Sequence, residues 1–271
     1  MSFLHRLAAV FSVSLKRLWA QKGLTAATLA GLVAGVALIM AVPLYADAVN
    51  FRVLEEQLSQ GADRAHKPPF AYLYDYIGSW AGPVTWDRTR PLDDYLRGPG
   101  AAGLGLPVTV FASHFETGAY RLYPGGGDYA PDAALGPATF ATAENLAGHV
   151  TLTAGAFPAP STAPDAPVEV LVSDARATEL GLQVGDELVM FNPAAAERET
   201  PIRVAGTWVA TNPDDDYWYF EPSFLSERLF VPIETFRDRI AGGAPAINRA
   251  VWYVVADGRG ITTENVAGLA A

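Results

Sequence analysis

The most prominent pattern along the chain is an uninterrupted apolar stretch near the amino terminus, which runs from Gly23 to Ala46 without a charged residue. At about 1.5 Å of rise per residue, a helix of this length spans roughly 36 Å, enough to cross a hydrocarbon core of about 30 Å. Gly31 and Gly35 are spaced as in membrane helices that pack closely against one another. The pattern predicts one transmembrane helix over residues 23–46.

Apolar positions continue at helical spacing on both sides of this stretch. Over residues 1–22 the apolar positions form one face of a helix and the basic and polar positions lie on another. This predicts an amphipathic helix in the cytoplasmic membrane interface, or else a longer solvated helix end. Over residues 47–61 the apolar positions predict a rigid stalk helix that Gly61 ends. The residues expected at the membrane interface are Arg6, Lys16, Arg17, Trp19 and Lys22.

Beyond the stalk the pattern is that of an α+β, strand-rich domain over residues 62–271. Aromatic residues occupy every second position from 70 to 76, which predicts a strand whose aromatic face packs into a core or, as the less frequent role, binds sugars or lipids. Further strands are expected over 107–113, 168–173, 187–191, 202–210 and 250–257, with short helices near 92–97, 174–180 and 232–240. Loops rich in glycine and proline are expected at 98–107, 124–138 and 154–167, and the last is the candidate boundary between two lobes.

Charge divides the chain into two parts. The segment before residue 47 carries four basic residues and no acidic one, so the total of −10 leaves −14 for residues 47–271. Basic flanks stay on the cytoplasmic side, which places the amino terminus inside and the large domain outside. "ADA" at 46–48 resembles a signal-peptide cleavage site, but the preceding basic and apolar regions are longer than a signal peptide needs, which favours a retained anchor.

The composition also limits the chemistry of the outer domain. No cysteine is present, which excludes disulfides, thiolate metal sites and an acyl-anchored lipoprotein. The acidic exterior argues against nucleic-acid binding. The sequence has no phosphate-binding loop, zinc-protease helix or serine nucleophile elbow, and "GPGAAG" at 98–103 does not follow a strand, which indicates a flexible loop. The four histidines are far apart, and "HFE" at 114–116 indicates a surface histidine. We therefore expect no catalytic, cofactor-binding or metal-binding residues.

Carboxylate and aromatic residues are concentrated in the stretch "NPDDDYWYFEP" at 212–222. Clustered carboxylates can bind calcium, but the register of a calcium-binding loop does not fit. A glycosidase needs two carboxylates at a fixed separation, which a sequence cannot establish. We expect a solvated acidic turn that packs its aromatic residues, with some candidates for a ligand-binding surface: Asp214, Asp215, Asp216, Tyr217 and Trp218.

A second motif, "ELGLQVGDELVMF" at 179–191, combines a helix end, a tight turn and an apolar strand. Gly181 suits the left-handed end of a helix, Gly185 permits a tight path, and Asp186 can accept from nearby backbone amides. With Gly206 of the following "VAG", these residues indicate a structural joint rather than a ligand site.

The order of these features resembles the amino-terminal part of MacB/FtsX-like ABC-transporter permeases: a basic start, one span, a stalk, and an outer domain with the segment strand, helix, "LGLQVGD", strand, "VAG". The resemblance implies a membrane subunit that uses no cofactor and does not hydrolyse ATP, contacts the lipid bilayer, works with a separate ABC ATPase, and forms a homodimer or paired halves. It also implies an amino-terminal fragment, since such permeases have further membrane helices. The alternatives are a single-pass ligand-binding surface protein and a secreted hydrolase.

Overall fold

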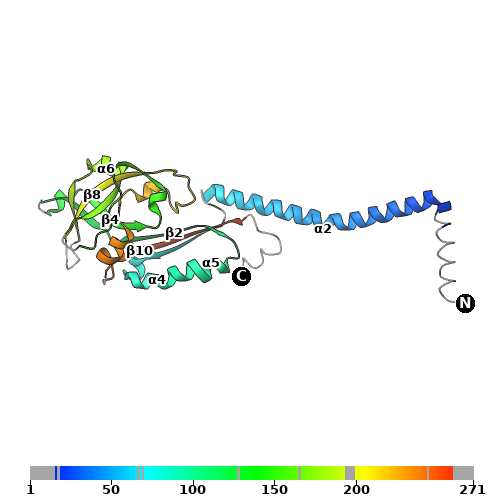
Figure 1. Ribbon diagram of the computed structural model, residues 1–271, viewed down its shortest axis with the longest axis horizontal. Coiled ribbons are helices and arrows are strands. Elements are labelled where there is room, and N and C mark those ends of the chain that lie inside the picture. The colour runs from blue at the N-terminus through cyan, green and yellow to red at the C-terminus, as the bar shows by residue number, and fades with distance from the viewer. Residues whose placement is uncertain are drawn as a thin grey trace. The chain divides into compact units, whose positions relative to one another are not determined.

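The computed structural model describes residues 16, 19–65, 68, 70–126, 129–163, 166–192, 199–242 and 244–258 (Figure 1). The chain divides into an amino-terminal unit through Gln60 and a compact unit over Gly61–Ile261. Each is described by itself.

The amino-terminal unit is dominated by one long helix, α2 (Lys22–Ala65), which is 44 residues long. Its first 20 residues, Lys22–Ala41, have a mean hydropathy of 2.1 and are long and apolar enough to cross a membrane. The helix then continues through the predicted stalk and passes Gly61, because a single glycine costs only about 1 kcal/mol in a helix that is otherwise favourable. The predicted interfacial helix over 1–22 lies mostly outside the described residues.

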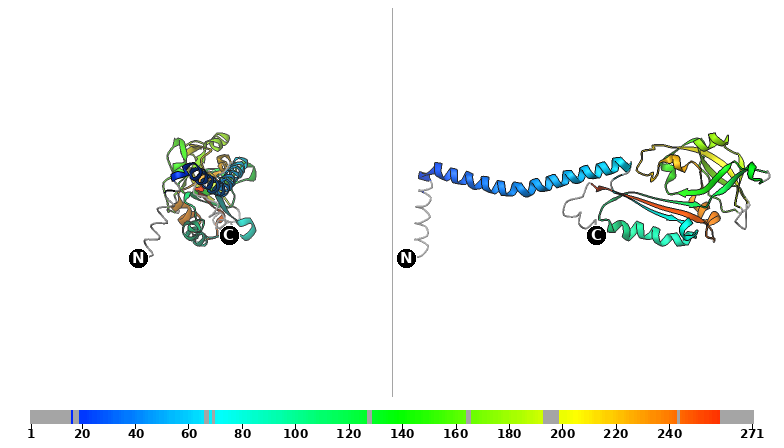
Figure 2. Two further views of the ribbon diagram at one scale, coloured as in Figure 1. Left: turned by 90° about the vertical axis from the view of Figure 1, so that its right-hand side faces the viewer. Right: turned by 180° about the vertical axis from the view of Figure 1, so that it is seen from behind.

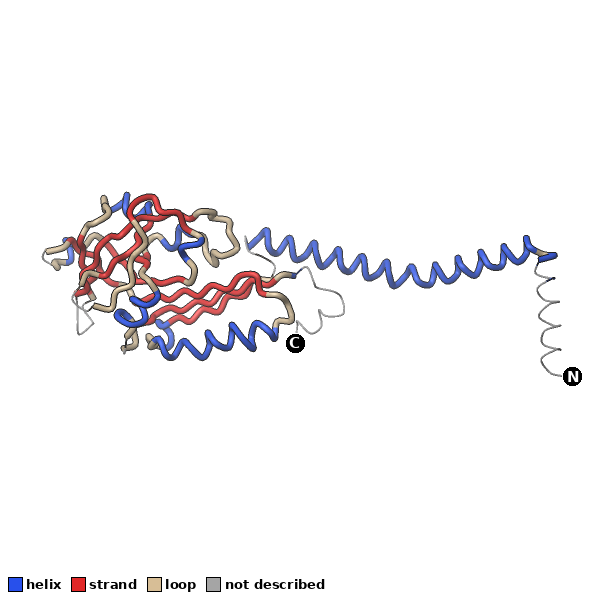
Figure 3. Tube along the Cα trace, viewed as in Figure 1, coloured by secondary structure: helices blue, strands red, loops and turns tan. Residues whose placement is uncertain are grey.

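The compact unit contains strands joined by short helices (Figure 3). Its strands are β1 (Ala71–Ile77), β2 (Val108–Thr117), β3 (Tyr120–Pro124), β4 (Gly136–Ala143), β5 (Val150–Gly155), β6 (Val168–Ser173), β7 (Glu187–Phe191), β8 (Glu199–Ala210), β9 (Arg228–Phe230) and β10 (Ile247–Ala256). Its helices are α3 (Gly78–Ala81), α4 (Trp86–Tyr95), α5 (Ala101–Gly103), α6 (Asp174–Leu180) and α7 (Ile233–Thr235), with π-helical turns η1 (Leu96–Gly100) and η5 (Phe236–Ile240) and 3-10 turns η2 (Pro131–Ala133), η3 (Leu146–Gly148) and η4 (Pro222–Leu225).

The strand pairings combine a closed ring with an open extension. In the described residues β4 pairs with β3, then β7, β8, β6 and β9 follow, and β9 pairs back onto β4, while β5 pairs with β8. The extension is the antiparallel order β1–β10–β2, which joins the ring where β2 pairs with β4. Figure 2 shows the long strands of the extension from behind.

One face of the extension is covered by a helix. The elements α4, η1 and α5 follow one another without a break along β10 and β2 (Figures 1 and 3). The prediction of a loop at 98–103 is therefore wrong. Leu96 is buried, and the Arg97 guanidinium lies 4.1 Å from the centre of the Phe111 ring, so packing outweighs the glycines. Pro99 cannot donate an α-helical hydrogen bond, and the helix widens to a π-turn there.

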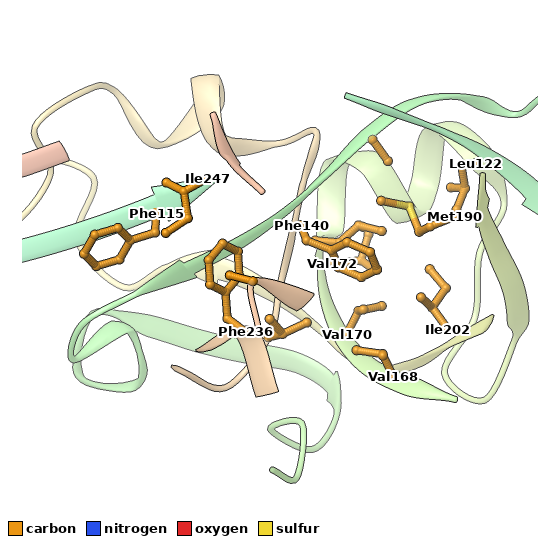
Figure 4. Close-up of a cluster of buried hydrophobic side chains, with 14 of the residues drawn as sticks. Phe115, Leu122, Phe140, Val168, Val170, Val172, Met190, Ile202, Phe236 and Ile247 are labelled. Atoms are coloured by element: carbon orange, nitrogen blue, oxygen red, sulfur yellow. The ribbon is translucent and has the colours of Figure 1, made fainter. Parts of the chain in front are cut away.

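Two hydrophobic clusters fill the compact unit. One lies inside the ring and under the helix. Figure 4 shows its aliphatic residues from β6, β7 and β8 near Phe140, and Phe115 next to Ile247. The other lies on the opposite face of the extension and contains Trp208 and Tyr253. The segment proposed as a lobe boundary joins β5 and β6, which both pair with β8, and this gives no support to a boundary there.

The sequence prediction of an α+β architecture with one apolar amino-terminal helix is confirmed. The strands β6 and β7 and the helix α6 have the predicted bounds, and β1, β2, β8 and β10 lie where strands were expected. The strands β3, β4, β5 and β9 were missed. The helix predicted from Pro232 begins one residue later, because Pro232 has an extended ψ of 146° and precedes the first turn.

Candidate functional site

The strand that follows α2 is fastened to the last described strand of the domain. Ala71 at the start of β1 pairs with Val255 near the end of β10, and Ala256 N–H donates to the Phe70 carbonyl at 3.0 Å. A Cβ at Gly258 would overlap the Phe70 ring, so glycine allows the backbone to lie against it. Any pull on the chain at residue 70 is thus shared by two strands.

At the other end of the same strands, a row of alternating charges crosses the sheet. Asp75 of β1 accepts from Arg249 of β10 at 2.7 and 3.1 Å. Arg249 is in register with Glu116 of β2. Glu116 Oε1 accepts from Arg228 Nε of β9 at 3.1 Å and lies 2.7 Å from His114 Nε2. The row therefore links the extension to the ring.

Glu116 is the centre of this row and is buried. Burial alone would raise the pKa of its carboxyl, but the hydrogen bond and charge of His114 and the charge of Arg228 outweigh burial and lower the pKa to about 2. Because the carboxylate is ionised, His114 Nε2 must be the donor. Burial raises the pKa of the neighbouring Tyr219 well above its usual range, and its hydroxyl has no hydrogen-bond partner among the described residues. The cluster holds fixed charges rather than an exposed acid or base.

The histidine at position 114 was expected at the surface, and this expectation is wrong. Its side chain is 2% exposed and packs 5.8 Å from Phe230 and 5.6 Å from Tyr219, measured between ring centres. The sequence signal that could have identified the cluster is the spacing of His114 and Glu116, which share one face of a strand. Their partner Arg228 comes from a three-residue strand that periodicity does not detect.

A second polar cluster ties the covering helix to the sheet. Asp93 accepts from Trp252 Nε1 at 3.0 Å and from Arg97 Nε at 2.8 Å. Arg97 also donates to Glu144, which accepts from Ser113 Oγ at 3.0 Å. The helix, β10, β2 and the turn after β4 are therefore connected through side chains as well as through packing.

The "ELGLQVGD" motif is a turn held by its own backbone. Gly181 has φ +68° at the end of α6, and Gly185 has φ +96°. Asp186 Oδ2 accepts from Gln183 N–H at 2.8 Å, and Asp186 O accepts from Val204 N–H at 3.0 Å. These contacts fix how α6 leads into β7.

Gly206 lies where β5 and β8 approach closely. A Cβ at this position would lie 2.6 Å from the Ala156 carbonyl oxygen and 2.8 Å from that of Ala154. Only glycine fits without moving backbone. The close approach of the two strands therefore explains why position 206 is a glycine.

The acidic turn over 212–222 is partly built into the core. Tyr217 and Trp218 are buried, so these two rings are not part of the exposed surface suggested from the sequence. Asp215 accepts from Tyr217 N–H at 2.9 Å, and its other oxygen lies 3.1 Å from His149 Nδ1. The other two aspartates of the turn are exposed. In the described ranges no three His, Asp or Glu side chains gather as they would around a metal ion.

Of the residues predicted for the membrane interface, Lys16, Trp19 and Lys22 are described and exposed, whereas Arg6 and Arg17 lie outside the described residues. Among the described residues, the structure does not gather the predicted site residues around one cavity. What it does bring together is the charged row, which the sequence did not predict.

Comparisons with known proteins give similarity at the level of structure alone. No family model matches the chain, and no curated protein does. A crystal structure of a domain of a protein assigned as a permease from Porphyromonas gingivalis matches with a TM-score of 0.35 and 16% identity, over 62% of this chain and 70% of that one. The periplasmic region of MacB from Actinobacillus actinomycetemcomitans matches with a TM-score of 0.37 and 13% identity, over 69% of this chain and 71% of that one.

Proposed function

We propose that the chain is the membrane subunit, or the amino-terminal part of one, of an ABC transporter of the MacB/FtsX type. The observation that carries this proposal is the continuity of α2, one helix of 44 residues that includes both the apolar span and the stalk. A continuous helix is stiff along its axis, so movement of its membrane part reaches the outer end. The order of motifs in the sequence supports the same assignment.

In this proposal the energy comes from a separate ATPase subunit, because the sequence contains no phosphate-binding loop. The basic residues before the span favour a cytoplasmic amino terminus and an extracytoplasmic domain. Two such membrane subunits, as a homodimer or as paired halves, would place two outer domains above the bilayer. Their movement would export or extract a substrate.

The route inside the outer domain follows from the contacts of β1. Force that arrives at Phe70 is shared with β10 through the bond to Ala256. It then passes across the charged row, from Asp75 through Arg249 to Glu116 and into the ring. The contact between Arg228 and Glu116 resists separation, because parting the two would remove a partner from a buried carboxylate.

The test is a helix break in the stalk. Val53→Pro removes a hydrogen bond from the middle of α2 and kinks it, at a cost of about 3 kcal/mol. In the complete transporter we expect the variant to insert and to bind its ATPase normally but to lose transport, while the control Val53→Leu transports normally. Normal transport by the proline variant would refute the proposal that α2 acts as a rigid rod.

A further inference from the structure

The edge strand β1 is open to an additional strand. In the described part of the chain β1 pairs with β10 and with no other strand. Because Phe70 and Ala256 form a hydrogen-bonded pair, the alternation of an antiparallel ladder leaves the N–H and C=O groups of Leu73 and Asp75 pointing away from β10. These groups are available to a partner.

Natural edge strands usually carry protection against pairing, such as a free charge, a proline or a bulge. In β1 the register with β10 is continuous and proline is absent. Its single charged residue, Asp75, is held by Arg249 at 2.7 Å. Apolar side chains remain exposed on both faces of the strand, with Leu73 43% and Tyr74 40% exposed. The edge thus has the features of a binding strand rather than of a protected one.

Two aromatic side chains lie beside the arginine that holds this edge. The Arg249 guanidinium that holds Asp75 also lies 5.1 Å from the centre of the Phe220 ring, and Phe220 lies 6.4 Å from Phe224. Phe224 is 63% exposed. Arg249 pairs with Ile77, which points to the same face of the sheet as Leu73, so the aromatic pair lies on the face that carries Leu73.

The surroundings of this aromatic pair are acidic. The two arginines nearby, Arg228 and Arg249, are paired with Glu116 and Asp75. In the segment 212–227, the exposed charged residues that form no ion pair with another described residue are all acidic: Asp214, Asp216, Glu221 and Glu227. Charge complementarity therefore selects a basic partner.

We propose that the free edge of β1, with Phe224 and the acidic residues around it, binds an extended basic peptide segment by strand addition. The backbone of the peptide pairs with Leu73 and Asp75, alternate apolar side chains contact Leu73 and Phe224, and its basic side chains face the acidic residues. A second copy would bring the same acidic residues to this edge, so a basic peptide is favoured over a second copy. This binding is independent of coupling to an ATPase.

The probe is a synthetic peptide of alternating lysine and valine, about ten residues long to match a strand, titrated by fluorescence anisotropy against the full chain in a non-ionic detergent. Two comparison peptides isolate the two features of the site. One replaces lysine by glutamate, and the other keeps lysine but carries N-methyl groups on alternate amides, which prevents strand pairing. We expect the lysine peptide to bind, with an affinity that falls as salt rises, and each comparison peptide to bind at least about tenfold more weakly.

Variants of the chain test the same contacts from the other side. Leu73→Pro removes an outward N–H without removing a bond to β10 and should weaken binding about tenfold, whereas the control Leu73→Val keeps it. Should the proline variant fail to fold, Glu221→Gln with Glu227→Gln leaves the backbone intact and should weaken binding severalfold and reduce its salt dependence. No binding of the lysine peptide, equal binding of the N-methylated or the glutamate peptide, or a dimer that Leu73→Pro dissociates would each overturn the proposal. This assay does not measure transport, so failure of the peptide-binding proposal can be distinguished from failure of the proposal that α2 transmits movement.

Discussion

The charged row makes a quantitative prediction at its centre, Glu116. Glu116→Gln keeps the size and one acceptor of the side chain but removes the charge that Arg228 and His114 face. The pKa of Glu116 is lowered from 4.5 to about 2 in the folded protein. This difference of about 2.5 corresponds to about 3 kcal/mol of stability at neutral pH. The side chain is 7% exposed, so solvent screens the interaction little.

The pH dependence has a definite sign. A carboxyl whose pKa is lower in the folded state stabilises the fold above its unfolded value of 4.5, and this contribution is lost as the pH falls towards 2. The deficit of Glu116→Gln relative to the natural chain should therefore be full at pH 7 and close to zero at pH 2. For a domain of this size, about 3 kcal/mol corresponds to roughly 6 to 12 °C in Tm.

The assay is thermal unfolding of the detergent-solubilised chain at pH 7, 4 and 2, followed by near-ultraviolet circular dichroism. The matched control is Glu169→Gln, which removes one partner of the more exposed Glu169–Arg203 pair and should cost at most about 1 kcal/mol. A Tm for Glu116→Gln that equals that of the control at pH 7, or a deficit that persists unchanged at pH 2, would refute the assignment of Glu116 as a buried electrostatic link.

Two further substitutions test the joint around β7 and β8. Gly206→Ala should cost at least about 2 kcal/mol in unfolding experiments, because its Cβ would lie 2.6 Å from the Ala156 carbonyl, whereas Gly181→Ala, which has free space but φ +68°, should cost only about 1 kcal/mol; equal costs would contradict the close approach. Asp186→Ala should cost about 1 kcal/mol by leaving Gln183 N–H without its acceptor, while Asp186→Asn should retain most of the stability; an alanine variant as stable as the natural chain would show that the side chain does not hold the turn.

The elements with strong periodicity or definite end signals could be predicted from the sequence. The bounds of α6 are set by Ser173, whose hydroxyl accepts from Arg176 N–H, and by Gly181 in the left-handed region. The span within α2 is defined by the absence of charge over more than 20 positions. Such signals are local, so they do not depend on the rest of the fold.

The missed elements depend on distant contacts. The strand β4 begins with Gly136 and Pro137 and has little hydrophobic alternation, yet it is fixed by β2 and β3 on one edge and β9 on the other. The glycines and the proline over 98–103 predict a loop. The segment is helical because packing of Leu96 against the sheet outweighs their low helix propensity. Local propensity was a poor guide wherever tertiary contacts decide the conformation.

The candidate site was the least predictable part for the same reason. The charged row is formed by residues that lie far apart in the sequence and meet only because the sheet brings their four strands together. These residues are Asp75 of β1, Arg249 of β10, Glu116 of β2 and Arg228 of β9. The sequence directed attention instead to the acidic turn, where consecutive aspartates are conspicuous. Two of the aromatic residues of this turn, Tyr217 and Trp218, pack in the hydrophobic core.

The central claim is that α2 is one continuous rod, and a distance measurement tests it most directly. The chain contains no cysteine, so Leu24→Cys with Val53→Cys gives two spin labels without background. In a lipid nanodisc, pulsed electron spin resonance should give one narrow distance near 44 Å, since 29 residues rise by about 1.5 Å each in an unbroken helix. A distance many ångströms shorter, or a broad distribution, would mean that the helix breaks between membrane and domain and would contradict the account.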